Sequence, residues 1–131
     1  MDLESEFEYH VAMADTILYD GDFLHPTYAY INKGKIIGLN FEAHPECGNY
    51  NRKYLIGKNE EIAKIIIEID FYSDHCGETY DSIYVINYNT EKVMTYLKGV
   101  KSIETKNKKF IEKYTIDLNY YKTEIKKWHS R

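Results

Sequence analysis

The sequence predicts an α+β domain in which helices cover an antiparallel sheet. Three observations predict this class. Apolar residues recur at helical spacing near both ends of the chain, short β-rich runs fill the middle, and turn residues separate those runs. A length of 131 residues suits one domain with its own hydrophobic core. We therefore expect residues 1–131 to form a single globular domain.

Helices are expected at both ends of the chain, where apolar residues follow one another at spacings of three or four. A helix over 3–19 has the apolar stripe Leu3, Phe7, Val11, Ala14 and Leu18. A helix over 103–129 has the stripe Phe110, Tyr114, Leu118, Tyr121, Ile125 and Trp128. Lysines flank the second stripe, and we expect their stems to cover a core helix while their amines stay solvated. Nucleic-acid binding through this helix is therefore not expected.

Two β-hairpins are expected in the middle of the chain. The first joins two β-rich runs through turn residues 32–35, where Gly34 follows Asn32 and Lys33. The second joins two similar runs through residues 89–92. Residues 44–58 and 74–81 contain Pro, Gly, Asn and Asp, and we expect them to be loops.

Residues 62–73 fit two structures. Asn59 precedes two glutamates, an arrangement typical of a helix N-cap, and four isoleucines then share one helical face. However, Ile65, Ile67 and Ile69 also alternate as they would in a strand. We favour the helix on the strength of the cap. The expected element order is then α-β-β-α-β-β-α, with a sheet built from two hairpins.

Charge is distributed unevenly along the chain. The net charge is −4, yet residues 1–50 hold 9 acids against 2 bases, whereas residues 91–131 hold 5 acids against 11 bases. The chain is also rich in tyrosine, with 14 residues. An acidic surface steers basic partners, and tyrosine supplies large anchors with a polar tip. This combination favours a protein-binding surface.

The beginning of the chain is acidic and lacks the long apolar run of a secretory signal. No later segment approaches 18 uninterrupted apolar residues, which a membrane-spanning helix needs. We expect a cytoplasmic protein that does not enter a membrane. Two cysteines, Cys47 and Cys76, are too few for a disulfide scaffold and are expected to be free thiols.

An enzymatic alternative is built on loops 44–47 and 74–78, each of which offers a histidine and a cysteine. Such residues could bind zinc or form a thiol nucleophile with an imidazole base. The spacing argues against zinc, because His75 and Cys76 are adjacent and adjacent side chains usually point apart. The glycines also lack the spacing of a phosphate-binding loop. We expect no cofactor and no metal, and we favour a protein that is not an enzyme.

The favoured function is that of a small acidic binding module, in the form of an immunity or antitoxin-type inhibitor that covers a basic, nuclease-like toxin. A nuclease must present positive charge to nucleic acid, and an acidic domain competes for that surface. The candidate contact residues are Asp20, Asp22, Glu42, Glu46, Asp70, Asp74, Glu78, Tyr80 and Asp81. A third interpretation is a homo-oligomer in which the acidic front of one chain meets the basic tail of another.

Overall fold

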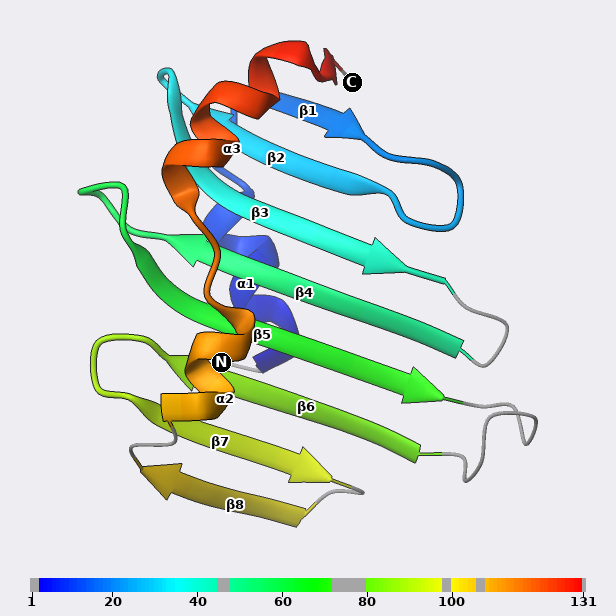
Figure 1. Cartoon of the computed structure of the whole chain (residues 1–131), viewed down its shortest axis with the longest axis vertical. Coiled ribbons are helices and arrows are strands. Elements are labelled where there is room, and N and C mark those ends of the chain that lie inside the picture. The colour runs from blue at the N-terminus through cyan, green and yellow to red at the C-terminus, as the bar shows by residue number, and fades with distance from the viewer. Residues whose placement is uncertain (1–2, 45–47, 72–79, 98–99, 106–107, 131) are drawn as a thin grey trace.

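Eight strands run back and forth in chain order and form one antiparallel sheet (Figure 1). The computed structural model describes residues 3–44, 48–71, 80–97, 100–105 and 108–130. Within them the strands are β1 Thr16–Asp20, β2 Thr27–Asn32, β3 Lys35–Ala43, β4 Gly48–Ile56, β5 Ile62–Phe71, β6 Tyr80–Asn87, β7 Lys92–Leu97 and β8 Val100–Thr105. A two-residue strand, β9 His129–Ser130, pairs with β1 at one edge. The α+β class is therefore confirmed.

Helices cover both faces of this sheet. Helix α1, Leu3–Val11, packs on the face that carries Leu55, Ile66 and Val85, which we call the α1 face. Helices α2, Lys108–Tyr114, and α3, Leu118–Glu124, cross the opposite face, which we call the C-terminal face (Figure 1). A 3₁₀ turn, Ile125–Lys127, follows α3. No helix among the described residues is long and apolar enough to span a membrane.

Both expected strand pairs are present, as β2/β3 and β6/β7. The β2/β3 turn places Lys33 and Gly34 at φ 52° and 79°, the left-handed values that a tight hairpin turn requires. These pairs are only part of a continuous eight-strand meander, however. The expected order α-β-β-α-β-β-α and the sheet of two hairpins are therefore wrong.

The first helix is shorter than the expected 3–19, because it ends at Val11 and the chain then enters β1. The Asp15 N–H donates to the Ile31 carbonyl at 2.9 Å, and the Asp15 carboxylate accepts from the Lys33 N–H at 2.9 Å. These bonds tie the start of β1 to the β2/β3 hairpin. Thr16 and Ile17 are β-branched and suit this strand. Leu18 therefore has the helical spacing of the apolar stripe but does not lie on the helix. It packs from β1 on the C-terminal face.

Residues 62–73 do not form the expected helix, because Ile62–Phe71 is the strand β5. Ile65, Ile66 and Ile67 are 0%, 1% and 0% exposed, since helices cover both faces of this central strand. A strand buried on both faces is apolar without interruption, and this hides its alternation. The expected N-cap is instead a turn between β4 and β5, in which Glu60 has φ 60° and its N–H donates to the Gly57 carbonyl at 3.0 Å.

The loop expected over 44–58 is mostly the strand β4. Its polar residues stand mainly in the first two thirds of the strand, and Tyr54 and Leu55 near its end are buried on opposite faces. Within the loop expected over 74–81, Tyr80 and Asp81 belong to β6. The remainder of that segment lies outside the described residues.

The single helix expected over 103–129 is in fact β8, α2, α3, a 3₁₀ turn and β9. Asp117 separates the two helices: its backbone is extended, and its carboxylate accepts from the N–H groups of Asn119 and Tyr120 at 3.0 and 3.4 Å. All six apolar residues of the expected stripe nevertheless pack on the core. The helical spacing therefore identified side chains that pack on the core, although the backbone that carries them is not one helix.

Candidate functional site

The meander brings three acidic segments to one end of the sheet. Strands β1, β3 and β5 end there, and β2, β4 and β6 begin there, on the right of Figure 1. We call segments 20–26, 42–50 and 68–81 the acidic end. In sequence they contain nine aspartates and glutamates and no lysine or arginine. Asp20, Glu42 and Asp70, which are sequence-predicted contact residues far apart in the chain, thus belong to one end of the sheet.

The structure describes six of the nine predicted contact residues. Asp20 and Asp22 are exposed at the end of β1 and just after it. Glu42 pairs in register with Asn51 of β4, and Asp70 of β5 pairs with Asp81 of β6. Tyr80 pairs in register with Phe71. The remaining predicted residues, Glu46, Asp74 and Glu78, lie outside the described residues.

Sequence reasoning missed two apolar residues at this end. Phe23 is 91% exposed and Leu24 is 51% exposed, in the connection between β1 and β2. Exposed large apolar side chains beside acidic ones are typical of protein-binding surfaces. The signal was Asp22-Phe-Leu-His-Pro26, in which an aspartate that forms a turn precedes two apolar residues.

Hydrogen bonds hold this connection in one shape. The Asp22 carboxylate accepts from the N–H groups of Leu24 and His25 at 2.9 and 2.8 Å. The Leu24 carbonyl in turn accepts from the His44 N–H at 2.9 Å, which fastens the connection to the end of β3. The N–H of His25 is the main cause that lowers the pKa of the Asp22 carboxyl, which is therefore ionised at neutral pH. Phe23 is thus exposed on an ordered backbone.

A chain of polar contacts continues along the α1 face. Glu42 accepts from Asn40 at 3.1 Å and contacts His44 Nε2 at 3.1 Å, while His44 Nδ1 lies 2.8 Å from Asn49 Oδ1. The contacts with Asn49 and Glu42 raise the pKa of His44. Asn40 is buried, and its Oδ1 has no hydrogen-bond partner among the described residues. The network fixes the Glu42 carboxylate in place beside the β1–β2 connection.

Lys53 sits between two carboxylates next to this network. Its Nζ lies 3.1 Å from Glu8 of α1 and 2.6 Å from Glu68 of β5. The Glu68 contact is a close ion pair. Burial lowers the pKa of Lys53, but the two carboxylates outweigh burial and the net shift is upward. One cation paired with two anions leaves a net negative charge here. Glu68 escaped sequence reasoning because its segment was interpreted as a helix.

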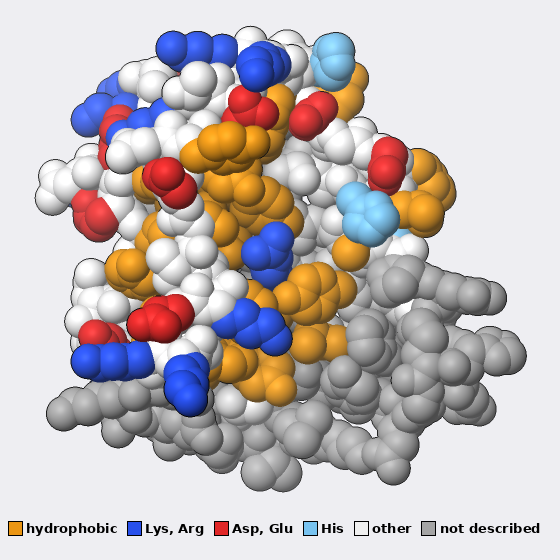
Figure 2. Space-filling model, in the orientation of Figure 1, with side chains coloured by type: hydrophobic (Ala, Val, Ile, Leu, Met, Phe, Trp, Pro, Cys, Tyr) orange, Lys and Arg blue, Asp and Glu red, His pale blue; other side chains and the backbone are white. Residues whose placement is uncertain are grey.

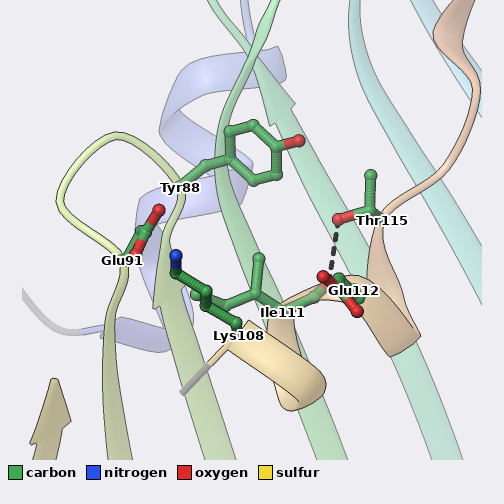
Figure 3. A pocket seen from close by; sticks show the side chains of 6 residues that line it. All are labelled: Tyr88, Glu91, Lys108, Ile111, Glu112 and Thr115. Atoms are coloured by element: carbon green, nitrogen blue, oxygen red, sulfur yellow. Dashed lines mark hydrogen bonds between the residues drawn. The ribbon is translucent and has the colours of Figure 1, made fainter. Parts of the chain in front are cut away.

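A pocket of about 500 Å³ lies at the opposite end of the sheet, between the β6/β7 turn and α2 (Figure 3). Its lining residues are Tyr88, Glu91, Lys108, Ile111, Glu112 and Thr115. The Thr115 hydroxyl donates to the Ile111 carbonyl at 2.8 Å and is not directed at a ligand. Two carboxylates and one amine line the pocket together, so its lining is of mixed charge, with only one negative charge in excess. The acidic end is the stronger candidate site.

The enzymatic alternative is addressed only in part by the structure. Gly48 at the start of β4 pairs in register with Phe71 at the end of β5, and residues 45–47 and 72–79, which adjoin these two positions in the chain, lie outside the described residues. Cys47, His75 and Cys76 lie outside the described residues. Of the loop histidines, His44 is described, and Glu42 and Asn49 already contact both of its ring nitrogens.

Among the residues that the structure describes, no group of three His, Cys, Asp or Glu side chains is arranged to hold a metal ion. The described part of the chain therefore adds nothing to the zinc interpretation. Comparison of the chain with models of protein families, with curated proteins and with solved structures gave no match.

Proposed function

We propose that this protein is a binding module whose acidic end covers a basic surface of a partner protein. The observation that carries the proposal is the composition of that end. The described residues of three segments far apart in the chain contribute six aspartates and glutamates and no lysine or arginine. A surface of one sign raises the encounter rate with oppositely charged partners and rejects partners of like charge.

Exposed apolar residues supply the second requirement of a binding surface. Charge at the rim speeds association, whereas buried apolar and aromatic anchors provide most of the affinity. Phe23 and Leu24 stand between Asp22 and the strand β2 on an ordered connection. An ordered anchor loses little conformational entropy when it binds, so more of its contact energy appears as affinity.

The concrete form of the proposal is an immunity-type inhibitor of a nuclease-like toxin. A nuclease binds phosphates through a positively charged surface. An acidic end that occupies this surface excludes nucleic acid by competition, and it needs no catalytic residue and no cofactor. The immunity-type form of the proposal rests on the negative charge of the acidic end and on the exposed apolar residues beside it, Phe23 and Leu24.

The first step of the test is a pull-down from the native cell at low salt, which identifies the partner. The second step compares two variants with equal changes in net charge. One reverses Asp20→Lys and Asp70→Lys at the acidic end. The other reverses Glu61→Lys and Glu112→Lys, which are exposed residues elsewhere on the molecule.

We expect the first variant to reduce the association rate at least about tenfold at low salt, because steering depends on local charge. The difference should shrink at high salt as the charges are screened. The control variant should change the rate less than about twofold. Equal losses in both variants would mean that only net charge matters, and unchanged binding in the first would remove the acidic end from the proposal.

A further inference from the structure

Arg52 occupies an unusual place on the C-terminal face. It lies on β4 and is half-buried, and it pairs in register with Phe41 of β3 and Ile67 of β5. Its guanidinium carbon lies 4.9 Å from the Phe41 ring centroid. Its Nη1 donates to the Tyr54 hydroxyl at 3.2 Å, and that hydroxyl donates to the Tyr114 carbonyl at 2.5 Å. Arg52 is thus held in place by aromatic side chains.

No carboxylate balances this charge within the described residues. Every ion pair among them joins a carboxylate to a lysine or a histidine, and none involves Arg52. The next residue in the chain is the internal comparison, because Lys53 on the other face contacts two carboxylates. A partly desolvated charge is normally paired. Arg52 therefore retains an attraction for an anion that the described fold does not satisfy.

The groups around Arg52 are hydrogen-bond donors. A guanidinium has five N–H donors, and the Tyr54 hydroxyl accepts from one of them. The Arg52 charge also acts on the hydroxyls of Tyr50 and Tyr121. Burial raises the pKa of both tyrosines, so both hydroxyls keep the proton at neutral pH. A hydrogen bond with Tyr114 also raises the pKa of Tyr50, so the Tyr121 hydroxyl is the one that we expect to donate to a ligand.

This face also provides apolar walls and a second cation. Figure 2 shows hydrophobic side chains gathered beside the C-terminal helices, with Lys or Arg side chains among them. Phe41 meets the rings of Tyr54 and Tyr121 edge-on, with centroids 5.5 and 5.3 Å apart. The exposed Lys113 lies with its Nζ 5.3 Å from the Tyr114 ring centroid. A flat ligand with one negative charge suits such surroundings.

We propose that Arg52 and the neighbouring tyrosines form a binding site for a carboxylate group whose flat body packs against Phe41 and Tyr121. A carboxylate matches the guanidinium fork with two parallel hydrogen bonds. A tetrahedral phosphate has no flat apolar body and therefore gains less from the aromatic walls. The carboxylate belongs either to a protein or to a free small acid. The site is separate from the acidic end, and the inference does not depend on the proposed partner.

The test uses the full chain and depends on its small number of arginines. The chain contains two arginines, Arg52 and Arg131. A ¹H–¹⁵N spectrum therefore shows two Nε–Hε signals, and Arg131 serves as the internal reference. The protein is titrated with sodium benzoate, with the neutral analogue benzamide, and with inorganic phosphate, all at constant ionic strength.

We expect the Arg52 signal to shift and to saturate with benzoate, with half-saturation on the order of 1 mM for a ligand of this size. The Arg131 signal should not saturate, and benzamide should not shift Arg52. An Arg52 shift that grows linearly without saturation overturns the proposal, as does an equal shift of both signals. Saturation by phosphate at a lower concentration than benzoate overturns the choice of carboxylate. These outcomes need only the unmodified protein.

Two further measurements define the site. Arg52→Lys keeps the charge but loses the fork, so we expect benzoate to bind at least about tenfold more weakly. Unchanged affinity in this variant contradicts the fork geometry. A short peptide that ends in phenylalanine is compared with its amidated form to find the source of the carboxylate. Tighter binding of the free-acid peptide than of benzoate supports a protein-borne carboxylate, and tighter binding of benzoate supports a free small acid.

Discussion

Two neighbouring residues of β4, Arg52 and Lys53, point to opposite faces of the sheet and meet opposite environments. Lys53 contacts two carboxylates on the α1 face, whereas Arg52 lies among aromatic rings on the C-terminal face. Successive residues of a strand face opposite sides. Their adjacency in sequence therefore says nothing about their partners. The unbalanced charge of Arg52 became visible only once strands β3 to β5 were paired.

Phe23 provides the sharpest prediction at the scale of single residues. Because it is 91% exposed, Phe23→Ala should change the free energy of unfolding by less than about 0.5 kcal/mol. If Phe23 anchors the partner, the same change should weaken binding at least about tenfold. Denaturant unfolding and calorimetric titration with the recovered partner measure the two quantities.

The matched control for Phe23 is Met13→Ala. Met13 is also well exposed, at 61%, and it precedes the start of β1, away from the acidic end. It should affect neither stability nor binding. A loss of affinity as large as that of Phe23→Ala would show that any exposed apolar residue matters, and the anchor role would fail.

At the scale of elements, helix α1 is fitted to the sheet at one glycine. A Cβ atom on Gly38 of β3 would lie 2.6 Å from Cγ1 of Val11 and 3.2 Å from the ring of Phe7. The helix also donates a hydrogen bond from His10 Nε2 to the Ile37 carbonyl at 2.8 Å. The absence of a side chain at residue 38 thus sets how closely α1 approaches.

Gly38→Ala should therefore reduce the free energy of unfolding by about 1–3 kcal/mol, the cost typical of an overpacked core. Val11→Ala removes the atom that the new Cβ would meet. In the Val11→Ala background, Gly38→Ala should cost clearly less, and a double-mutant cycle from denaturant unfolding measures the difference. Additive costs would mean that residues 11 and 38 do not limit the approach of α1.

The element boundaries reveal which local signals were misleading. Asn59 followed by two glutamates has the composition of a helix start, yet Glu60 takes a left-handed turn conformation between β4 and β5. Asp117, which interrupts the expected C-terminal helix, is itself an N-cap. The same residue types form caps and turns because both use a side chain or backbone group to bond nearby N–H groups. Whether such residues form a helix cap or a turn was decided only by the neighbouring strands.

At the scale of the whole molecule, the C-terminal face joins the sheet to α2 and α3 through tyrosines. Tyr54 is completely buried, and its hydroxyl bonds to the Tyr114 carbonyl between the helices. Burial raises the pKa of Tyr50, Tyr54 and Tyr121 above the ordinary tyrosine value. The folded state therefore retains protons that the unfolded state releases near pH 10.

The free energy of unfolding should consequently be constant between about pH 8 and 9 and fall as pH rises above about 10. Each retained proton contributes a slope of up to about 1.4 kcal/mol per pH unit. The raised pKa of Lys53 acts in the same direction. Denaturant unfolding from pH 8 to 11.5 measures the slope, and absorbance at 295 nm isolates the tyrosines. Titration of all tyrosines together near pH 10, without loss of stability, would contradict the buried interface.

Spacing and composition by themselves determined the α+β class, the turn at Lys33 and Gly34, and the six C-terminal side chains that pack on the core. These features depend on residues close in sequence, or on apolarity alone. The tertiary structure decided that 62–71 is a strand, that the segment 103–129 is not one helix, and that the acidic segments share one end of the sheet. Strand pairing is the physical reason: its hydrogen bonds join distant residues, and an apolar run satisfies a helix or a doubly covered strand equally well until those partners are present.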